Sequence, residues 1–141
     1  MAIFFHAEEV KFPPIKKGET ANWIHTVAKT HGKNIGEISY LFCNDKKILE
    51  INRQYLQHDY YTDIITFDYS EESTISGDIF ISLDTVLSNS QKYNTPFIQE
   101  LYRVIIHGIL HLCGMQDDSE EKEKEMREAE DRALLLIHTN Q

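Results

Sequence analysis

The sequence predicts an α+β domain in which about five helices pack on a small mixed β-sheet of about four strands. Runs rich in Ile and Phe alternate with helix-like stretches, and the apolar spacing changes accordingly along the chain. The resulting order is β-α-β-α-β-β-α-α-α, with helices between the early strands and at the end. The length of 141 residues fits one domain, residues 1–141, without a visible linker or internal repeat.

The first elements follow from local patterns. Residues 2–5 are predicted to form a short strand. Thr20 can cap a helix whose apolar residues recur with helical spacing, and this helix is expected to end near Gly32. Apolar residues alternate with others over residues 36–43, which is typical of a strand with one buried face.

The middle of the chain predicts one more helix and two strands. Asn44 is a suitable cap for the second helix, because its side chain can accept a hydrogen bond from a free backbone N–H. Residues 63–67 and 77–82 are rich in Ile and Phe and are predicted as strands. The polar stretch 70–76 is expected to join these two strands.

The remaining chain is predicted to be helical. A short helix opens at Asp84, and the next has strong boundaries: Thr95 as cap, Pro96 at the first position and Gly114 as stop. Apolar residues surround this helix, so we expect it to be buried on all sides. The last helix is expected to begin near Asp118, and most of its charges are interpreted as a solvated face.

The acidic composition limits the functions that the chain can have. It has 14 basic and 23 acidic residues, a net charge of −9, and no basic run, which argues against non-specific nucleic-acid binding and against DNA as a partner. The apolar stretches are far short of the roughly 20 residues of a membrane span, and the first residues do not resemble a signal peptide. Cys43 and Cys113 form no CxxC pattern, so we expect a cytoplasmic protein.

A histidine pair on the buried helix is the most informative motif. His107 and His111 are four residues apart, which puts both imidazoles on one helical face within reach of one ion. Gly114 then allows the backbone to reverse, and Asp117 follows three residues later. This spacing is that of metzincin zinc peptidases, whose three protein ligands leave one coordination position open. Because imidazole suits zinc, we expect one Zn²⁺ per chain.

Two other interpretations of this motif stay open. The histidines could be core residues that are hydrogen-bonded to backbone groups or carboxylates. A peptidase is disfavoured, because Gly108 stands where zinc peptidases carry the glutamate that acts as general base. Phosphodiester chemistry depends mostly on positioning and charge stabilisation, so it is compatible with the motif.

Three segments resemble the YbeY family, the rRNA maturation factors described as metal-dependent endoribonucleases. Residues 100–118 resemble its HGxLHLxGYDH signature, residues 52–67 its Asn-x-x-Tyr and Thr-Asp stretch, and residues 77–82 its Gly-Asp-Ile strand. The resemblance implies a zincin-like fold with a zinc ion. It also implies a role in maturation of the 3′ end of small-subunit (16S) rRNA and in ribosome quality control.

The resemblance also implies roles for individual residues. His107 and His111 carry over as metal ligands and catalytic residues. The third ligand is a histidine in the family signature and Asp117 in this chain. Aspartate is an ordinary zinc ligand, so we expect the site to persist with one more negative charge.

A second departure from the family concerns the guanidinium thought to face phosphate. The family often has Arg directly after the Tyr of Asn-x-x-Tyr, and this chain has Leu56 there. We expect Arg53, one helical turn earlier, to act as the catalytic arginine, and His58 is a second candidate. The alternative is that Arg53 is an ordinary surface residue without a role in the site. Asp63 either orients water or caps local amides.

These observations predict a zinc-dependent endoribonuclease directed at single-stranded RNA, with ribosomal RNA and the small ribosomal subunit as partners. We expect a monomer whose first 60 residues, with eight Lys and Arg, meet RNA, while the acidic last helix faces away. The alternative is a metal-binding, ribosome-associated assembly factor with little catalysis of its own.

Overall fold

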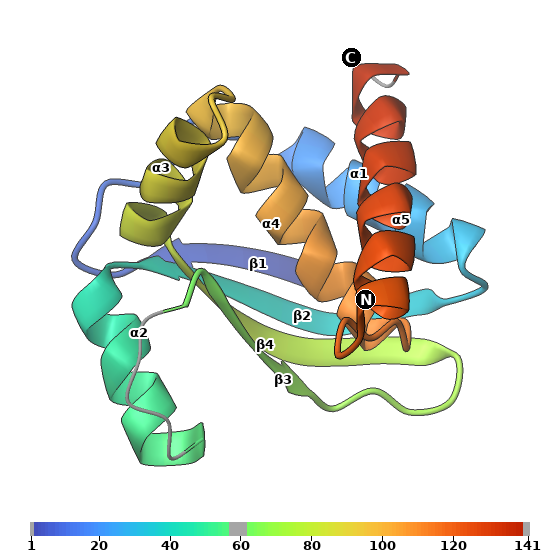
Figure 1. Cartoon of the computed structure of the whole chain (residues 1–141). Coiled ribbons are helices and arrows are strands. Elements are labelled where there is room, and N and C mark those ends of the chain that lie inside the picture. Colours follow the sequence, from blue (N-terminus) through green and yellow to red (C-terminus); the bar gives the residue numbers. More distant parts are fainter. Residues whose placement is uncertain (1, 57–61, 140–141) are drawn as a thin grey trace.

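The computed structural model describes residues 2–56 and 62–139, in which helices and strands follow the predicted order (Figure 1). Two helices separate the first three strands, and three helices end this part of the chain. The elements are β1 (Ala2–Ala7), α1 (Lys17–Thr30), β2 (Asn34–Cys43), α2 (Asp45–Ile51), the π-helical turn η1 (Asn52–Leu56), β3 (Ile64–Asp68), β4 (Thr74–Ser82), α3 (Leu83–Lys92), α4 (Phe97–Leu112) and α5 (Glu120–Thr139).

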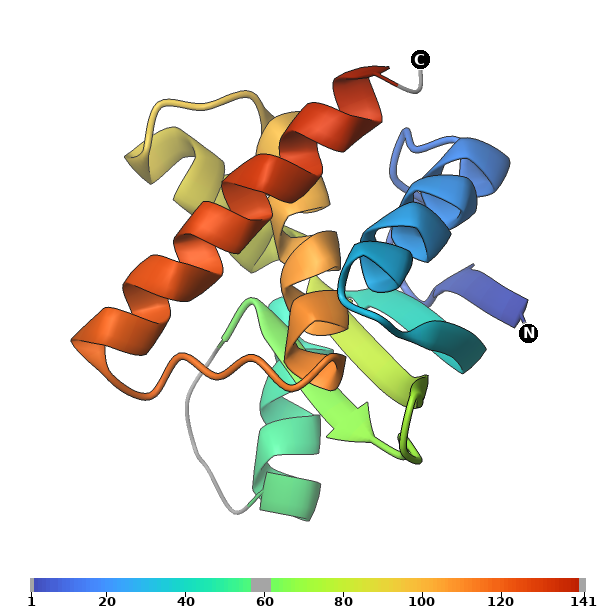
Figure 2. The same ribbon diagram turned by 90° about the vertical axis from the view of Figure 1, so that its right-hand side faces the viewer.

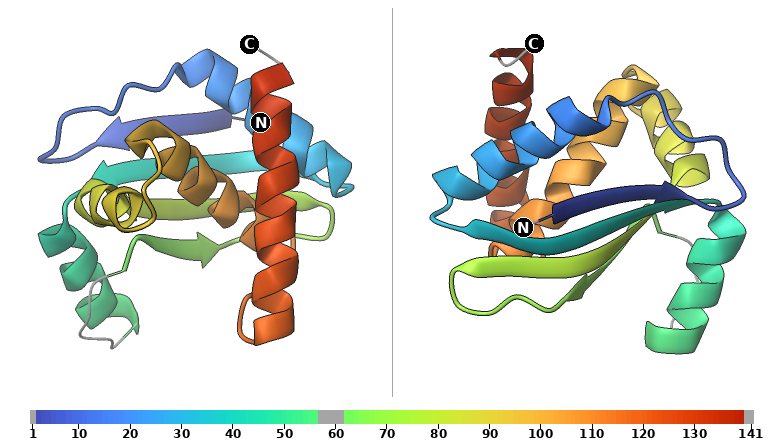
Figure 3. Two further views of the ribbon diagram at one scale, coloured as in Figure 1. Left: turned by 45° about the horizontal axis from the view of Figure 1, so that its top comes forward. Right: turned by 180° about the vertical axis from the view of Figure 1, so that it is seen from behind.

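The four strands form one mixed sheet in the order β1-β2-β4-β3. β1, β2 and β4 are parallel, and β3 pairs antiparallel with β4 at one edge. Helices α1, α3, α4 and α5 lie over one face of the sheet, and α2 lies on the opposite side at one end (Figures 1 and 3). The predicted α+β class, with a small mixed sheet and about five helices, is confirmed.

The core lies between the sheet and α4. Apolar side chains of α4 face both the sheet and the neighbouring helices. The prediction that α4 is buried on all sides is only partly right, because Arg103, His107 and His111 are partly exposed. Two buried hydrogen bonds tie the layers together: Tyr40 Oη donates to the Ile105 carbonyl at 2.8 Å, and Trp23 Nε1 donates to the Ala133 carbonyl at 2.8 Å. The first joins the sheet to α4, and the second joins α1 to α5.

Two of the predicted helix caps are wrong. Thr20 lies inside α1, which begins three residues earlier, and the cap position is Lys16. Thr95 precedes Pro96, which is the cap residue of α4 and makes no side-chain capping bond. Both threonine hydroxyls are buried without a hydrogen-bond partner among the described residues, because tertiary packing encloses them.

Other predicted boundaries hold. The side chain of Asn44 accepts a hydrogen bond from the backbone N–H three residues later, as expected of a cap. Gly32 and Gly114 follow α1 and α4 with φ of 72° and 104°, so both adopt the left-handed conformation of a helix stop. α5 begins at Glu120, close to the predicted start near Asp118, and the hydroxyl of Ser119 caps it by accepting the N–H three residues later. None of the helices in residues 2–56 and 62–139 combines the length and the apolarity that a bilayer crossing requires.

We expect Gly77→Ala to lower the free energy of unfolding by about 1–3 kcal/mol, as overpacking does. A methyl group on Gly77 would clash with the Phe67 carbonyl oxygen, which belongs to the backbone of the neighbouring strand. Gly18→Ala is the matched control, because open space surrounds that position and the change should stabilise by up to about 1 kcal/mol. Urea unfolding measures both values, and equal stabilities of the two variants would contradict this account.

Candidate functional site

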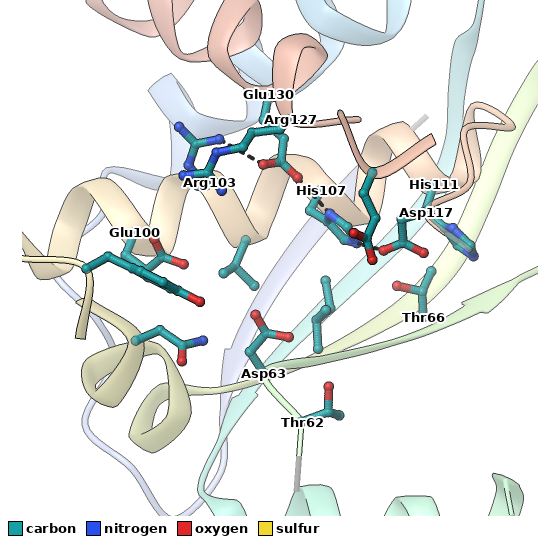
Figure 4. Close-up of a pocket in the computed structure, with 15 residues that line it drawn as sticks. Thr62, Asp63, Thr66, Glu100, Arg103, His107, His111, Asp117, Arg127 and Glu130 are labelled. Atoms are coloured by element: carbon teal, nitrogen blue, oxygen red, sulfur yellow. Dashed lines mark hydrogen bonds and ion pairs between the residues drawn. The ribbon is translucent and has the colours of Figure 1, made fainter. Parts of the chain in front are cut away.

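A cleft of about 630 Å³ opens between α4, α5 and the beginning of β3. α5 crosses over α4, and the segment between these two helices returns beneath them (Figure 2). Carboxylates, imidazoles and guanidiniums line the cleft together (Figure 4). Its acidic, basic and histidine residues, among those that the structure describes, are Asp63, Glu100, Arg103, His107, His111, Asp117, Glu123, Arg127 and Glu130.

The predicted histidine pair and Asp117 all line this cleft. His107 and His111 lie one turn apart on α4, and the left-handed turn at Gly114 sends the chain back towards them. The Nε2 atom of His107 lies 3.4 Å from an Oδ2 atom of Asp117. All three residues of the motif therefore line one cleft, and His107 and Asp117 contact each other, while a shared metal site stays a prediction.

The donor atoms of His107 and Asp117 have a separation that suits a shared ion. Two ligands with bonds of about 2.0–2.1 Å to a tetrahedral zinc lie roughly 3.4 Å apart. His111 lines the same cleft, but within the described part of the chain no three His, Cys, Asp or Glu side chains are gathered closely enough to hold an ion. The donor set fits zinc chemically, and His111 would have to turn towards the other two.

Glu130 is the site residue that the sequence interpretation missed. Its Oε2 atom lies 2.7 Å from Nδ1 of His107, and its Oε1 accepts a hydrogen bond from Arg103 at 2.8 Å. Glu130 shares the buried side of α5 with apolar residues at helical spacing, namely Met126, Ala129, Ala133, Leu134 and Ile137. This apolar spacing in the sequence could have shown that Glu130 lies on the buried side of α5, unlike the solvated charged residues of the same helix.

The orientation of α5 also differs from the prediction. The acidic last helix was expected to face away from the site, yet Glu123, Arg127 and Glu130 from this helix line the cleft. The reason is that the buried side of α5 packs on α4, which carries its flanking charged residues to the mouth of the cleft.

The cleft favours positive charge. Burial alone would lower the pKa of His107, but the hydrogen bond and charge of Glu130, with Asp117 and Asp63 nearby, raise it above its ordinary value. Burial raises the pKa of Asp63, although His107 and local hydrogen bonds act in the opposite direction. Carboxylates thus surround His107, and a cation at this position would be stabilised by their charge.

The position after the first histidine, Gly108, packs closely against the sheet. It is buried against the sheet, and a Cβ atom there would lie 3.0 Å from Ile79 and 3.1 Å from Ile64. A larger side chain at this position would point into packed side chains of β3 and β4. A glutamate at this position would therefore have to displace side chains of the sheet.

The predicted catalytic arginine lies elsewhere. Arg53 belongs to η1 and is not among the described residues that line the cleft. His58, the second candidate, lies outside the described residues. The guanidiniums that do line the cleft are Arg103 and Arg127, from α4 and α5. Asp63 lines the cleft, and its carboxylate accepts hydrogen bonds from local backbone amides, as the capping interpretation predicts. A role in orienting water stays a prediction.

Comparison with known proteins identifies the family. The family described as Endoribonuclease YbeY matches residues 5–138. The chain belongs to the YbeY endoribonuclease family. A Bacteroides fragilis relative named Endoribonuclease YbeY is 60% identical over 136 residues, which cover 96% of this chain and 98% of the relative. A Porphyromonas gingivalis relative of the same name is 53% identical over 135 residues, or 96% and 89% of the two chains.

A solved structure has the same fold. The solution structure of a Thermotoga maritima protein matches with a TM-score of 0.70 and 26% sequence identity, over 96% of this chain and 89% of that one. The predicted resemblance to YbeY proteins and the prediction of an enzyme that cleaves RNA are confirmed. YbeY proteins are metal-dependent nucleases in general, which agrees with the donor set in the cleft.

We expect Asp63→Asn to stabilise the protein more at pH 7 than at pH 4, relative to the wild type. Burial raises the pKa of Asp63, so at pH 7 the folded protein holds an ionised carboxylate that has lost part of its hydration. As the pH falls through the folded pKa, this carboxylate becomes protonated and the cost disappears. Urea unfolding with a chelator present measures the free energy of unfolding of the variant and of the wild type at each pH. A stability difference between the two proteins that is the same at pH 4 and pH 7 would contradict this argument.

Proposed function

We propose that this chain is a zinc-dependent endoribonuclease that cuts single-stranded RNA during maturation of the 3′ end of small-subunit (16S) rRNA and in ribosome quality control. The observation that carries the proposal is the pair formed by His107 Nε2 and Asp117 Oδ2 in a charged cleft of a YbeY-family chain. An imidazole and a carboxylate at this separation are suited to sharing one zinc ion.

His107, His111 and Asp117 would hold the single ion. When bound, it would supply Lewis-acid polarisation of a scissile phosphate oxygen. His107 presents Nε2 to the cleft, and Asp117 contributes a negative charge that balances part of the charge of the ion. His107 and His111 are thus the proposed catalytic residues through their role as ligands.

Arg127 is the cleft cation best suited to contact the RNA backbone. The guanidinium of Arg103 is already bound to two carboxylates, Glu130 at 2.8 Å and Asp131 at 2.6 Å. Arg127 is exposed on α5, lines the cleft, and makes no ion pair with another residue of the described ranges. A free guanidinium suits phosphate recognition. Arg53 stays the competing proposal from the sequence.

The wider setting follows from the same proposal. We infer that residues 1–141 act as one domain and as a monomer, with ribosomal RNA and the small ribosomal subunit as partners and without DNA or membrane. Cys43 and Cys113 are free thiols, which supports a reducing cytoplasm. The acidic net charge supports weak and salt-sensitive binding to free RNA, with selectivity supplied by the ribosomal context.

A non-catalytic assembly factor is the second candidate, and Gly108 favours it. Because that position packs on the sheet, the cleft lacks the glutamate that serves zinc peptidases as general base. A chain that bound zinc and RNA without turnover would fit this alternative.

We expect His111→Ala to abolish cleavage of a small-subunit rRNA 3′ fragment and to lower the zinc content of the purified protein, because one of three ligands is lost. His25→Ala, an exposed histidine on α1, is the matched control and should cleave and bind zinc like the wild type. Gel-based cleavage and elemental analysis are the measurements.

The other outcomes of this experiment separate the candidates. Equal cleavage by both variants would mean a contaminating nuclease or a site elsewhere. If the wild type binds zinc but cleaves neither the fragment nor the same sequence in assembled small subunits, the non-catalytic factor is favoured.

We expect Arg127→Ala to weaken binding of single-stranded RNA about tenfold, since a charged hydrogen bond contributes roughly 1.5 kcal/mol. The slope of log K against log salt should fall by about 0.7, the value for one phosphate contact on a single strand. Arg53→Ala tests the competing arginine, and Arg132→Ala controls for net charge, because Arg132 is exposed on α5 but does not line this cleft. An effect of Arg53→Ala alone would transfer the role to Arg53.

A further inference from the structure

We infer that Glu130 is a positioning residue for the metal site: its carboxylate, held by Arg103, fixes the ring of His107 so that Nε2 presents its lone pair to the ion. This inference rests on the proposed function, in which His107 is a zinc ligand. It assigns a role in that site to the helix α5, which contributes none of the three predicted ligands.

The carboxylate of Glu130 uses both oxygens in buried contacts. Oε2 lies 2.7 Å from Nδ1 of His107, and Oε1 accepts from Nη1 of Arg103 at 2.8 Å. The Glu130 side chain is only 7% exposed, against 24% for His107 and 17% for Arg103. A buried carboxylate with both oxygens engaged has little freedom to turn away from either partner.

Helix geometry fixes this carboxylate from two sides. Arg103 and His107 are four residues apart on α4, so they point to the same side of that helix, one turn from each other. Glu130 reaches between them from the buried side of α5 (Figure 4). The second nitrogen of Arg103 binds Asp131 at 2.6 Å, so the guanidinium is itself anchored to α5 twice.

The contact determines which nitrogen of His107 is available to an ion. A carboxylate only accepts hydrogen bonds, so Nδ1 of His107 must carry the proton that it donates to Glu130. In the neutral imidazole, Nε2 then holds the lone pair, and Nε2 is the atom that faces Asp117 at 3.4 Å. Carboxylate partners of this kind orient metal-bound histidines, and their loss typically lowers metal affinity 10–100-fold.

The experiment compares Glu130→Gln with Asp131→Asn in the full-length protein. Glutamine keeps the size of the side chain but has one acceptor oxygen, which cannot serve both His107 and Arg103. Asp131→Asn is the matched control, because it alters the other carboxylate bound to Arg103 without touching His107. Zinc affinity is measured by competition with a chromophoric chelator, and urea unfolding of the metal-free proteins reports their stability.

We expect Glu130→Gln to lower zinc affinity at least tenfold, with Asp131→Asn within about threefold of the wild type. Unchanged affinity in Glu130→Gln would overturn the inference. An equal loss in both variants would also overturn it, since that result would assign the effect to the docking of α5.

A second measurement uses the wild type and does not depend on whether a variant folds. Nitrogen-15 NMR of the metal-free protein, at a pH where His107 is neutral, should show its proton on Nδ1, whereas a proton on Nε2 would overturn the inference. The two proposals fail separately: a chain that binds zinc in this manner without cleaving RNA contradicts the endoribonuclease proposal and leaves the role of Glu130 supported.

Discussion

Burial of α4 is the constraint on which the rest of the structure depends. This helix packs its apolar residues against the sheet on one side and against α1, α3 and α5 on the others. Only the strip that carries Arg103, His107 and His111 remains open to the cleft. Because so much apolar surface holds the helix, the two imidazoles sit on a rigid element, and rigid support is what a site of defined geometry requires.

The same packing limits the chemistry of the site. A Cβ atom at Gly108, the position after the first histidine, would lie 3.0 Å from Ile79 and 3.1 Å from Ile64, so a longer side chain there would have to displace side chains of the sheet. Besides Arg103, His107 and His111 of α4, the cleft therefore uses residues from α5, from the beginning of β3 and from the segment before α5. α5 contributes Arg127, the beginning of β3 contributes Asp63, and the segment before α5 contributes Asp117. The cleft is therefore assembled from segments far apart in the sequence.

Patterns within one helix were predictable, and contacts between helices were not. The all-round apolar pattern of α4, the histidine spacing and the stop at Gly114 each depend on neighbours within a few residues, and the structure has all three. The caps proposed for Thr20 and Thr95 were wrong because tertiary packing overrode a local preference. Glu130 escaped notice because its partners lie 23 and 27 residues away, and nothing in the local sequence pairs an acidic helix with a histidine on another helix.

The charges around His107 form a balanced set in the proposed site. Asp117 replaces an imidazole ligand by an anion, which lowers the net positive charge that an ion would present to phosphate. Glu130 places a second carboxylate behind the same imidazole, and this would make His107 a stronger donor and lower that charge further. Arg103 offsets part of the second effect, because its guanidinium pairs with Glu130 from the opposite side and also with Asp131. The buried carboxylate can thus orient the ring while part of its charge is balanced by Arg103, which leaves Arg127 and the ion to meet the charge of RNA.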